Sequence, residues 1–245
     1  MKIYTKNLKQ NLSATNKVGL YLSVFLSILV IIFMLHYRSN KNNNYNILHD
    51  AIKRGDLEYI KNAINSGISI NLTNSDNFGS LLSLAVIHNK IKIVKFLIAQ
   101  KANINQVDNS HSSPFIIAAA RGHLDILKLL YENNADINLK CEYGRNALIW
   151  AAFSANSHQD IIKQLLKWGI DINSKDSDGN NALFWALYRR NYILAKYLIE
   201  AGIDIDSKNF KGVPSARYIL NKTKHENLSP KLREQFLAVK SAVKA

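Results

Sequence analysis

The residue types that most often carry out catalysis or bind metal ions are scattered along this 245-residue chain. Its seven histidines form neither an HExxH pair nor a set with cysteines at the spacing of zinc ligands. The ten glycines stand singly, so the chain has no glycine-rich loop that could cradle a phosphate. The sequence therefore predicts a protein that is not an enzyme, with no cofactor, no metal ion and no small-molecule substrate.

Asp171, Asp176 and Asp178 form the densest acidic group, and carboxylates at close spacing can bind Ca²⁺. Their spacing lacks the pattern of an EF-hand loop. Aspartates also form turns, because the short side chain accepts hydrogen bonds from the backbone that follows it. The sequence favours this turn-forming role.

These residues lie in a chain that repeats itself at intervals of 33 to 35 residues. Each copy opens with a short apolar run around an alanine, and its second half places apolar residues at i, i+1, i+3 and i+4, as at Ile126, Leu127, Leu129 and Leu130. This spacing predicts two helices per copy, the second with one broad apolar stripe. One copy cannot cover such a stripe, so the copies must stack and share a core. They end at Asn71, Asn105, Asn138, Asn173 and Asp206.

The end of each second helix needs a residue that tolerates left-handed backbone angles. Gly67, Gly169 and Gly202 occupy that position, and Asn134 is the next best choice. Lys101 is a poor choice there, which predicts either strain or a different turn at the end of the second copy.

The period, the run "GHLDILKLLYENNADIN" from Gly122 and the run "DSDGNNALFWA" from Asp176 resemble ankyrin repeats. The resemblance extends from Tyr45 to Leu220 and implies an all-α solenoid of helix-turn-helix units joined by hairpin loops. The predicted repeats cover residues 45–75, 76–109, 110–142, 143–177 and 178–210, with a partial sixth from 211 within an array of 45–222.

Several residues depart from the family pattern. Its Thr-Pro-Leu-His signature survives only as Ser113 with Pro114 and as Leu48 with His49. Apolar side chains replace the histidine in the later copies, which predicts a thin polar network between repeats. The fourth repeat also has two extra residues within "FSANSHQD", which should lengthen the turn between its helices. The residues in place of the histidine are Ile116, Ile149 and Phe184.

The segment from Val18 to Leu35 carries no charge, and as a helix it would span about 27 Å. This length favours a transmembrane helix over residues 18–37 rather than a cleaved signal peptide or a buried core helix. A basic flank, 1–17, precedes it and a polar linker, 38–44, follows it. Because four lysines lie before the segment and only Arg38 and Lys41 lie close after it, the repeats are expected on the non-cytoplasmic side.

The net charge of +14 is concentrated outside the repeats. Residues 1–43 carry +6, residues 207–245 carry +7, and the array between them carries only +1, which argues against nucleic acid as a partner. The basic tail could bind acidic lipids. A capping helix over 223–245, with Ser229 as N-cap and Pro230 at its first position, is the favoured interpretation. Its apolar face would contain Leu232, Phe236, Val239 and Val243.

The resemblance implies protein binding through the loop tips and the exposed face of the first helices. Arginine and tyrosine often dominate such surfaces. Trp150 and Trp185 occupy equivalent positions and are either core residues or an aromatic wall. The candidate partner-binding residues are Phe78, His88, His111, Arg121, Tyr143, Phe153, Asp178, Tyr188, Arg189 and Phe210.

Two functions are compatible with these features. The first is a membrane-anchored repeat protein that mediates protein-protein interaction through its loops and concave helix face. The alternative is a structural subunit that associates through its transmembrane helix, where Gly19, Ser23 and Ser27 recur every four residues. The lone thiol of Cys141, expected to be accessible in a hairpin, would report which side of the membrane the repeats occupy.

Overall fold

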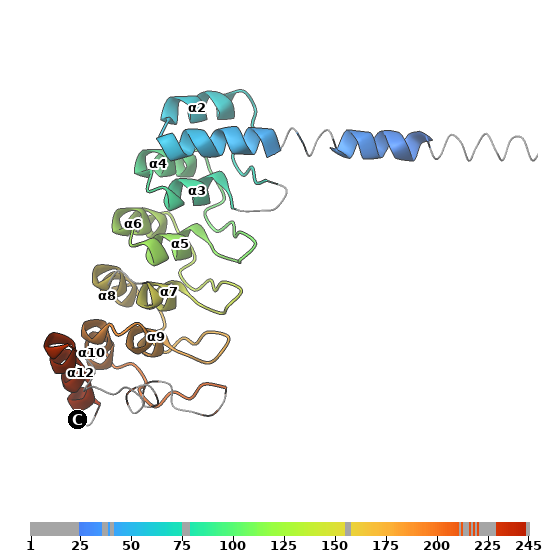
Figure 1. Ribbon diagram of the computed structural model, residues 1–245. Helices are drawn as coiled ribbons and strands as arrows, with labels where there is room; N and C mark the ends of the chain where they lie inside the picture. The colour runs from blue at the N-terminus through green and yellow to red at the C-terminus, as the bar shows by residue number, and fades with distance from the viewer. Residues whose placement is uncertain are drawn as a thin grey trace, which may run out of the picture.

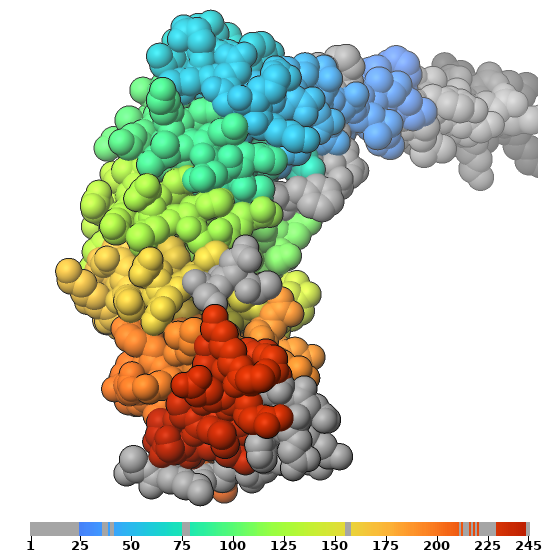
Figure 2. All heavy atoms as spheres, turned by 60° about the vertical axis from the view of Figure 1, so that its left-hand side comes forward, coloured from blue at the N-terminus to red at the C-terminus, as the bar shows by residue number. Residues whose placement is uncertain are grey.

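The structure, a computed structural model, describes residues 25–35, 39, 42–74, 79–154, 158–210, 212, 216, 218, 220 and 229–243. Its helices form successive antiparallel pairs, with loops projecting from one side (Figure 1). The pairs stack into a curved column (Figure 2). The first pair is the helix over 42–54 with α2 (Leu57–Asn65). The next pairs are α3 (Leu81–Ile87) with α4 (Ile91–Ala99), α5 (Pro114–Arg121) with α6 (Leu124–Glu132), α7 (Ala147–Phe153) with α8 (Gln159–Lys167), and α9 (Ala182–Tyr188) with α10 (Tyr192–Glu200).

The first helix of each pair lies next to the projecting loops, and the second helix lies on the outer side of the column (Figure 1). We call the loops 106–112, 139–145 and 174–180 fingers 3, 4 and 5, after the repeats that they precede or open. Neighbouring fingers are joined by backbone hydrogen bonds, from Glu142 N to Ser110 O at 2.9 Å and from Ser177 N to Tyr143 O at 2.8 Å. The fingers and first helices together form the face on which the candidate site lies.

The first helices start at one repeated capping position. Ser80, Ser113, Asn146 and Asn181 are buried, and each side-chain oxygen accepts a hydrogen bond from the backbone N–H three residues later. These side chains satisfy N–H groups that the helix itself leaves without partners. The short polar residue before each apolar run therefore fixes where the first helix begins.

The predicted apolar stripes are confirmed. Ile126, Leu127 and Leu130 of α6 are buried, and so are Ile161 and Ile162 of α8. They belong to one continuous core that runs from the first repeat to the last helix. The longer turn predicted for the fourth repeat is confirmed as well, because α7 ends at Phe153 and α8 begins only at Gln159.

The second helices end in the same left-handed turn, whatever residue occupies it. Gly67, Gly169 and Gly202 have φ angles of 96°, 81° and 87°, and Lys101 and Asn134 follow with 65° and 63°. The turn at Lys101 therefore has the same geometry as the turns at the glycines. The lysine adopts a left-handed conformation that is unfavourable for a residue with a Cβ atom.

Replacing Lys101 with glycine is expected to raise the free energy of unfolding by about 0.5 to 1 kcal/mol, because glycine adopts this angle without the steric cost. Urea unfolding followed by far-ultraviolet circular dichroism measures the change. A matched Lys95→Gly variant, in the middle of α4, should lose about 1 kcal/mol instead. A loss of stability in Lys101→Gly would contradict the prediction.

Polar contacts between repeats come from positions other than the missing histidines. The asparagines that close the repeats connect neighbours: Asn71 Oδ1 accepts from Asn103 N at 2.8 Å, and Asn173 Oδ1 accepts from Asp204 N at 2.8 Å. Asn105 Oδ1 likewise accepts from Asp136 N of the third repeat, at 2.9 Å. Side chains that the repeat period places one above another thus replace the missing histidines.

Two other histidines also connect repeats. His123 hydrogen-bonds to the backbone of Ile87, and His158 hydrogen-bonds to the backbone of Ala120, in each case one repeat earlier. Burial lowers the pKa of both imidazoles below the usual value, although these backbone contacts oppose the shift. Ser154 Oγ lies 3.0 Å from His158 Nε2 and adds a further hydrogen bond.

The lowered pKa values predict that acid destabilises the array. Well above about pH 6.5 these imidazoles are neutral in the folded and in the unfolded chain, so their contribution to the free energy of unfolding is fully present. As the pH falls below about 6.5, the unfolded chain binds protons that the folded chain does not, so the free energy of unfolding decreases. Urea unfolding at a series of pH values measures this slope. A His123→Gln, His158→Gln variant should show a shallower slope, and an unchanged slope would exclude these two histidines as its cause.

The first described helix of the array begins earlier than the predicted start of the repeats. Residues 42–44, predicted as linker, are helical and continue into the first repeat. Residues 25–35 also form a helix, but the predicted transmembrane segment lies partly outside the described residues, at 18–24 and 36–37. Among the residues that the structure describes, no helix combines the length and the hydropathy needed to cross a membrane.

The last helix, α12 (Pro230–Ala242), packs against α10. Pro230 occupies its first turn as expected, whereas the Ser229 side chain at the N-cap makes no capping hydrogen bond. Phe236 and Val239 are fully buried, and the Phe236 ring lies edge-on to Tyr192 with centroids 5.3 Å apart. This contact covers the apolar face of the fifth repeat.

Candidate functional site

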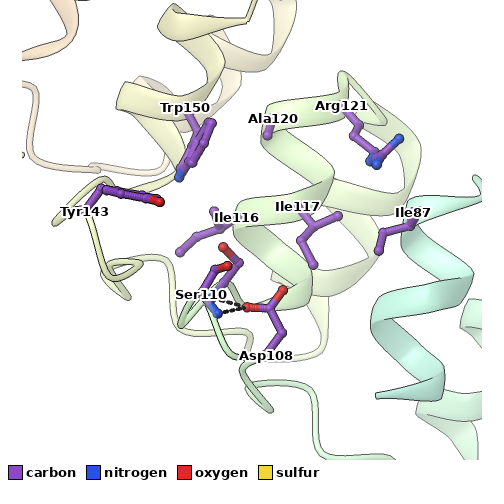
Figure 3. A pocket seen from close by; sticks show the side chains of 10 residues that line it. Ile87, Asp108, Ser110, Ile116, Ile117, Ala120, Arg121, Tyr143 and Trp150 are labelled. Carbon is purple, nitrogen blue, oxygen red and sulfur yellow. Dashed lines mark hydrogen bonds between the residues drawn. The ribbon is translucent and has the colours of Figure 1, made fainter. Parts of the chain in front are cut away.

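A hollow of about 260 Å³ lies between fingers 3 and 4 and the first helices behind them (Figure 3). Ile116 and Ile117 of α5 form its floor, and Trp150 and Tyr143 of the next repeat form one wall. Asp108 lies at the finger end of the hollow. The remaining lining residues are Ile87, Ser110, Ser112, Ala120 and Arg121.

The two ends of this hollow carry opposite charges. Asp108 Oδ1 accepts hydrogen bonds from Ser110 N and Ser112 N, both at 2.9 Å, so its carboxylate is held in the finger turn. Arg121, at the end of α5, is exposed at the other end of the hollow (Figure 3). The apolar floor between them is a suitable contact for a large side chain of a ligand.

Next to the hollow, Arg145 of finger 4 lies among four aromatic rings. Its guanidinium carbon is 4.3 Å from the ring centroid of Trp185, 4.7 Å from that of Phe153, 5.1 Å from that of Trp150 and 5.5 Å from that of Tyr143. Cations interact favourably with aromatic faces at such distances. Arg145 therefore joins the fourth and fifth repeats and supports the aromatic wall of the hollow.

Asp176 of finger 5 pairs with Arg145, with 3.7 Å between Oδ2 and Nε. This distance is that of an ion pair and not of a hydrogen bond, and the Arg145 Nε has no hydrogen-bond acceptor although it is buried. Asp176 Oδ2 also accepts from Trp185 Nε1 at 2.8 Å, and its Oδ1 accepts from the backbone of Asp178 and Asn180. One buried carboxylate thus holds the finger turn, a tryptophan and an arginine.

Cys141 occupies the position in finger 4 that Asp176 occupies in finger 5. Its sulfur accepts from Trp150 Nε1 at 3.3 Å, and only 5 % of the residue is exposed. The expectation of an accessible thiol is therefore wrong, because the indole of the following helix covers it.

The structure assigns Asp171 and Asp176 to turns. Asp171 Oδ1 accepts from Asn173 N at 2.9 Å, and Asp176 makes the finger contacts described above. Within the described ranges, no group of three or more His, Cys, Asp or Glu side chains is placed to hold a metal ion.

The two tryptophans differ in their surroundings. Trp185 is buried and packs edge-on against Phe153, with centroids 5.0 Å apart. Trp150 is half-buried and lines the hollow. The interpretation as core residues therefore holds for Trp185, whereas Trp150 forms part of an aromatic wall.

Five of the predicted site residues gather around this region. Arg121 and Tyr143 line the hollow, and Tyr143 is 53 % exposed. Phe153, Tyr188 and Arg189 surround Trp185 in the fifth repeat: Tyr188 is 61 % exposed, and Arg189 Nε donates to Phe153 O at 2.9 Å. These residues form a surface that continues from the hollow across two repeats.

Of the other predicted site residues, His88 directly follows Ile87 at the edge of the hollow, and the other described ones lie apart from this surface. His88 is half-buried in a contact with His49, with 3.2 Å between their Nε2 atoms. His111 and Asp178 are exposed at the tips of fingers 3 and 5. Phe210, 78 % exposed, is the last residue of the fifth repeat, and its backbone N donates to Asp178 O. Phe78 lies outside the described residues.

Sequence reasoning missed Arg145, Asp108 and the apolar floor of the hollow. Asp108 and Asp176 are equivalent by repeat period, so comparing the repeats column by column could have extended to Asp108 the turn-forming role predicted for Asp176. Arg145 has no arginine at the equivalent positions of the other fingers, and only its three-dimensional contacts reveal its importance.

Comparison with known proteins agrees with this arrangement of paired helices and fingers. The family model described as "Ankyrin repeats (3 copies)" matches residues 24–108, 82–176 and 115–209, which together cover more than half of the chain. It is the same family as the one that the sequence motifs resemble.

Individual relatives share only part of their length with this chain. The Drosophila melanogaster "Ankyrin repeat and KH domain-containing protein mask" is 32 % identical over 43 % of this chain and 3 % of its own length. A "Putative ankyrin repeat protein" of Rickettsia felis is 31 % identical over 47 % of this chain and 38 % of its own. The human "Transient receptor potential cation channel subfamily A member 1" is 29 % identical over 46 % and 13 %, respectively. The chain thus spans less than half of each of these relatives, and, by the match over most of its residues, it belongs to the ankyrin repeat family.

Proposed function

We propose that this chain is a membrane-anchored binding protein, without catalysis of its own, whose concave face captures a protein partner. Ankyrin repeats are generally protein-protein interaction modules. The observation that carries the proposal is the hollow together with the adjoining aromatic and arginine side chains, which are exposed or half-buried. We call this surface the groove, and it contains Arg121, Tyr143, Trp150, Phe153, Tyr188 and Arg189.

The composition of the groove favours a protein partner. Tyrosine, tryptophan and arginine are enriched among the side chains that contribute most to protein interfaces. The two aromatic residues bury large areas with few rotatable bonds. Arg145 and Asp176 hold the aromatic rings in place before a partner arrives. A preformed surface loses less conformational entropy on binding than a mobile one.

The proposed membrane anchor is supported by the exposed apolar helix over 25–35. Its large apolar side chains, from Phe25 to Leu35, are 46 to 67 % exposed. Such a contiguous apolar surface is costly in water and favourable in lipid. We propose that this helix is part of a longer membrane-embedded segment, with the repeats on the non-cytoplasmic side.

Site-specific photo-crosslinking in cells that naturally express the chain tests the proposed groove. A photoreactive phenylalanine derivative replaces Tyr143 or Tyr188, and both positions should crosslink to the same protein. Tyr59 of α2, 44 % exposed on an outer helix, is the matched control and should not crosslink to it. Equal crosslinking from Tyr59, or none from the two groove positions, would refute the proposal.

The proposed side of the membrane is tested with a thiol placed where the structure exposes it. Ser69 is exposed, so a Cys141→Ser, Ser69→Cys variant carries one accessible thiol. A membrane-impermeant maleimide should label it in intact cells. Labelling only after lysis would reverse the proposed orientation.

A further inference from the structure

Two cationic side chains and one imidazole lie at the carboxyl ends of the first helices in repeats 1 to 3. Lys53 is exposed near the end of the helix over 42–54, His88 follows α3, and Arg121 ends α5. We call these three residues the cationic edge. It continues directly from the hollow, because Ile87 and Arg121 both line that cavity.

The charge of the cationic edge is not neutralised within the described part of the chain. The ion pairs found there join Lys61 to Glu58, Arg145 to Asp176 and Lys196 to Glu200, and none of them includes Lys53 or Arg121. The pKa of His88 is lowered by burial and then by the neighbouring His49, Lys53, Arg121 and Lys90. Lys53, Lys90 and Arg121 thus place positive charge around His88, whose lowered pKa favours the neutral imidazole.

The hollow beside the cationic edge favours a polypeptide ligand over nucleic acid or a lipid headgroup. Its floor is apolar, and the Asp108 carboxylate at the finger end would repel a phosphate-rich strand or headgroup. A polypeptide can present an apolar side chain to the floor, carboxylates to one end and backbone N–H groups to the other. Nucleic acid and lipid headgroups lack this combination of groups.

We propose that the groove binds an acidic segment of the partner protein, with one large apolar side chain in the hollow and the adjoining carboxylates over Arg121, His88 and Lys53. This inference rests on the proposed binding function and specifies the chemistry of the partner. Complementary charges would accelerate association and align the segment along the groove.

Fluorescence anisotropy with the full-length protein in a nonionic detergent tests the inference. The probe is a labelled short peptide with one central Phe followed by a run of Glu, and the comparison peptide has Gln in place of every Glu. The Glu peptide should bind at least about tenfold more tightly than the Gln peptide. Its binding should weaken when the salt concentration rises from about 50 mM to about 300 mM, since salt screens exposed charges.

A charge-reversed variant locates the contact. Lys53→Glu with Arg121→Glu should weaken binding of the Glu peptide about tenfold or more. Lys95→Glu with Lys163→Glu, at exposed positions on the outer helices α4 and α8, changes the net charge equally and should leave the affinity within about twofold. Retained secondary structure in both variants shows that folding is not the cause.

The contrary outcomes separate this inference from the proposed function. Equal affinity for the Glu and Gln peptides, or absence of binding by both, overturns the acidic-segment inference. So do equal losses in the edge and outer-helix variants. None of these results affects the crosslinking contrast between Tyr143 and Tyr59, which reports on the groove as a protein-binding surface. Preferential binding of an oligonucleotide or of anionic vesicles at the cationic edge would also overturn the inference.

Discussion

Replacing Asp176 with alanine is expected to destabilise the protein by about 3 to 5 kcal/mol, the loss typical of removing one partner from a buried ion pair. The Asp176 side chain is 2 % exposed and Arg145 is 13 % exposed, so the arginine would keep its charge in a site with little access to water. The same substitution removes the acceptor for Trp185 Nε1 and for two backbone N–H groups of finger 5. The indole N–H of Trp185 and the backbone N–H of Asn180 add to the loss, because both lie in buried hydrogen bonds.

Urea unfolding of the two proteins measures this loss. Asp136→Ala is the matched control: Asp136 Oδ1 also accepts a backbone hydrogen bond in a turn, from Asn138 N at 2.9 Å, but the residue is exposed. Its replacement should cost about 1 kcal/mol or less. Losses of similar size in the two variants would show that Asp176 acts only as a turn former.

The Asp176→Ala variant should also change the groove. Without the carboxylate, the Arg145 guanidinium has no anion within ion-pair distance among the described residues, and the rings that it contacts lose a fixed neighbour. Crosslinking from Tyr143 should fall together with stability, since Tyr143 and Trp150 both contact Arg145.

Gly122→Ala is expected to destabilise the protein by about 2 to 4 kcal/mol, from backbone strain together with steric overlap. Gly122 has a φ angle of 76°, and a Cβ atom there would overlap the ring of His158 in the next repeat. To avoid the overlap, His158 must give up its contacts with Ser154 and with the backbone of Ala120. The loss thus combines a local cost with a broken contact between repeats.

Gly169→Ala separates these two contributions. Gly169 has a φ angle of 81°, but no atom lies within 4 Å of the position that a Cβ would take. This variant should therefore lose only the strain cost, about 1 kcal/mol. If both variants lost the same free energy in urea unfolding, the contact between Gly122 and His158 would have no energetic role.

Much of the fold could be predicted from the sequence because the information is local. The apolar spacing at Ile126, Leu127 and Leu130 defines a helical stripe within a few residues, and this stripe is buried in the structure. The left-handed turns at Gly67 and Gly169 likewise follow from single residues, since glycine alone adopts those angles without steric cost. Repetition of these signals then requires stacking, because no single copy covers its own apolar face.

The candidate site could be predicted only in part. The exposed Tyr143 and Tyr188 follow from the family pattern, whereas the wall formed by Trp150 and Arg145 does not. The prediction of an accessible Cys141 was wrong for the same reason: whether an indole covers the thiol depends on the angle at which finger 4 returns to its helix.

The sequence by itself determined the repeat period, the helix pairs, the turns that end them and the separation of charge from the array. The tertiary structure decided which side chains meet between repeats: Arg145 with Asp176, Gly122 with His158, and Asp108 with the hollow. The physical reason is the range of the interactions. Helical periodicity and backbone preferences act over three or four residues. The tertiary contacts join different repeats, or join a finger to a first helix, and they therefore depend on how neighbouring units stack.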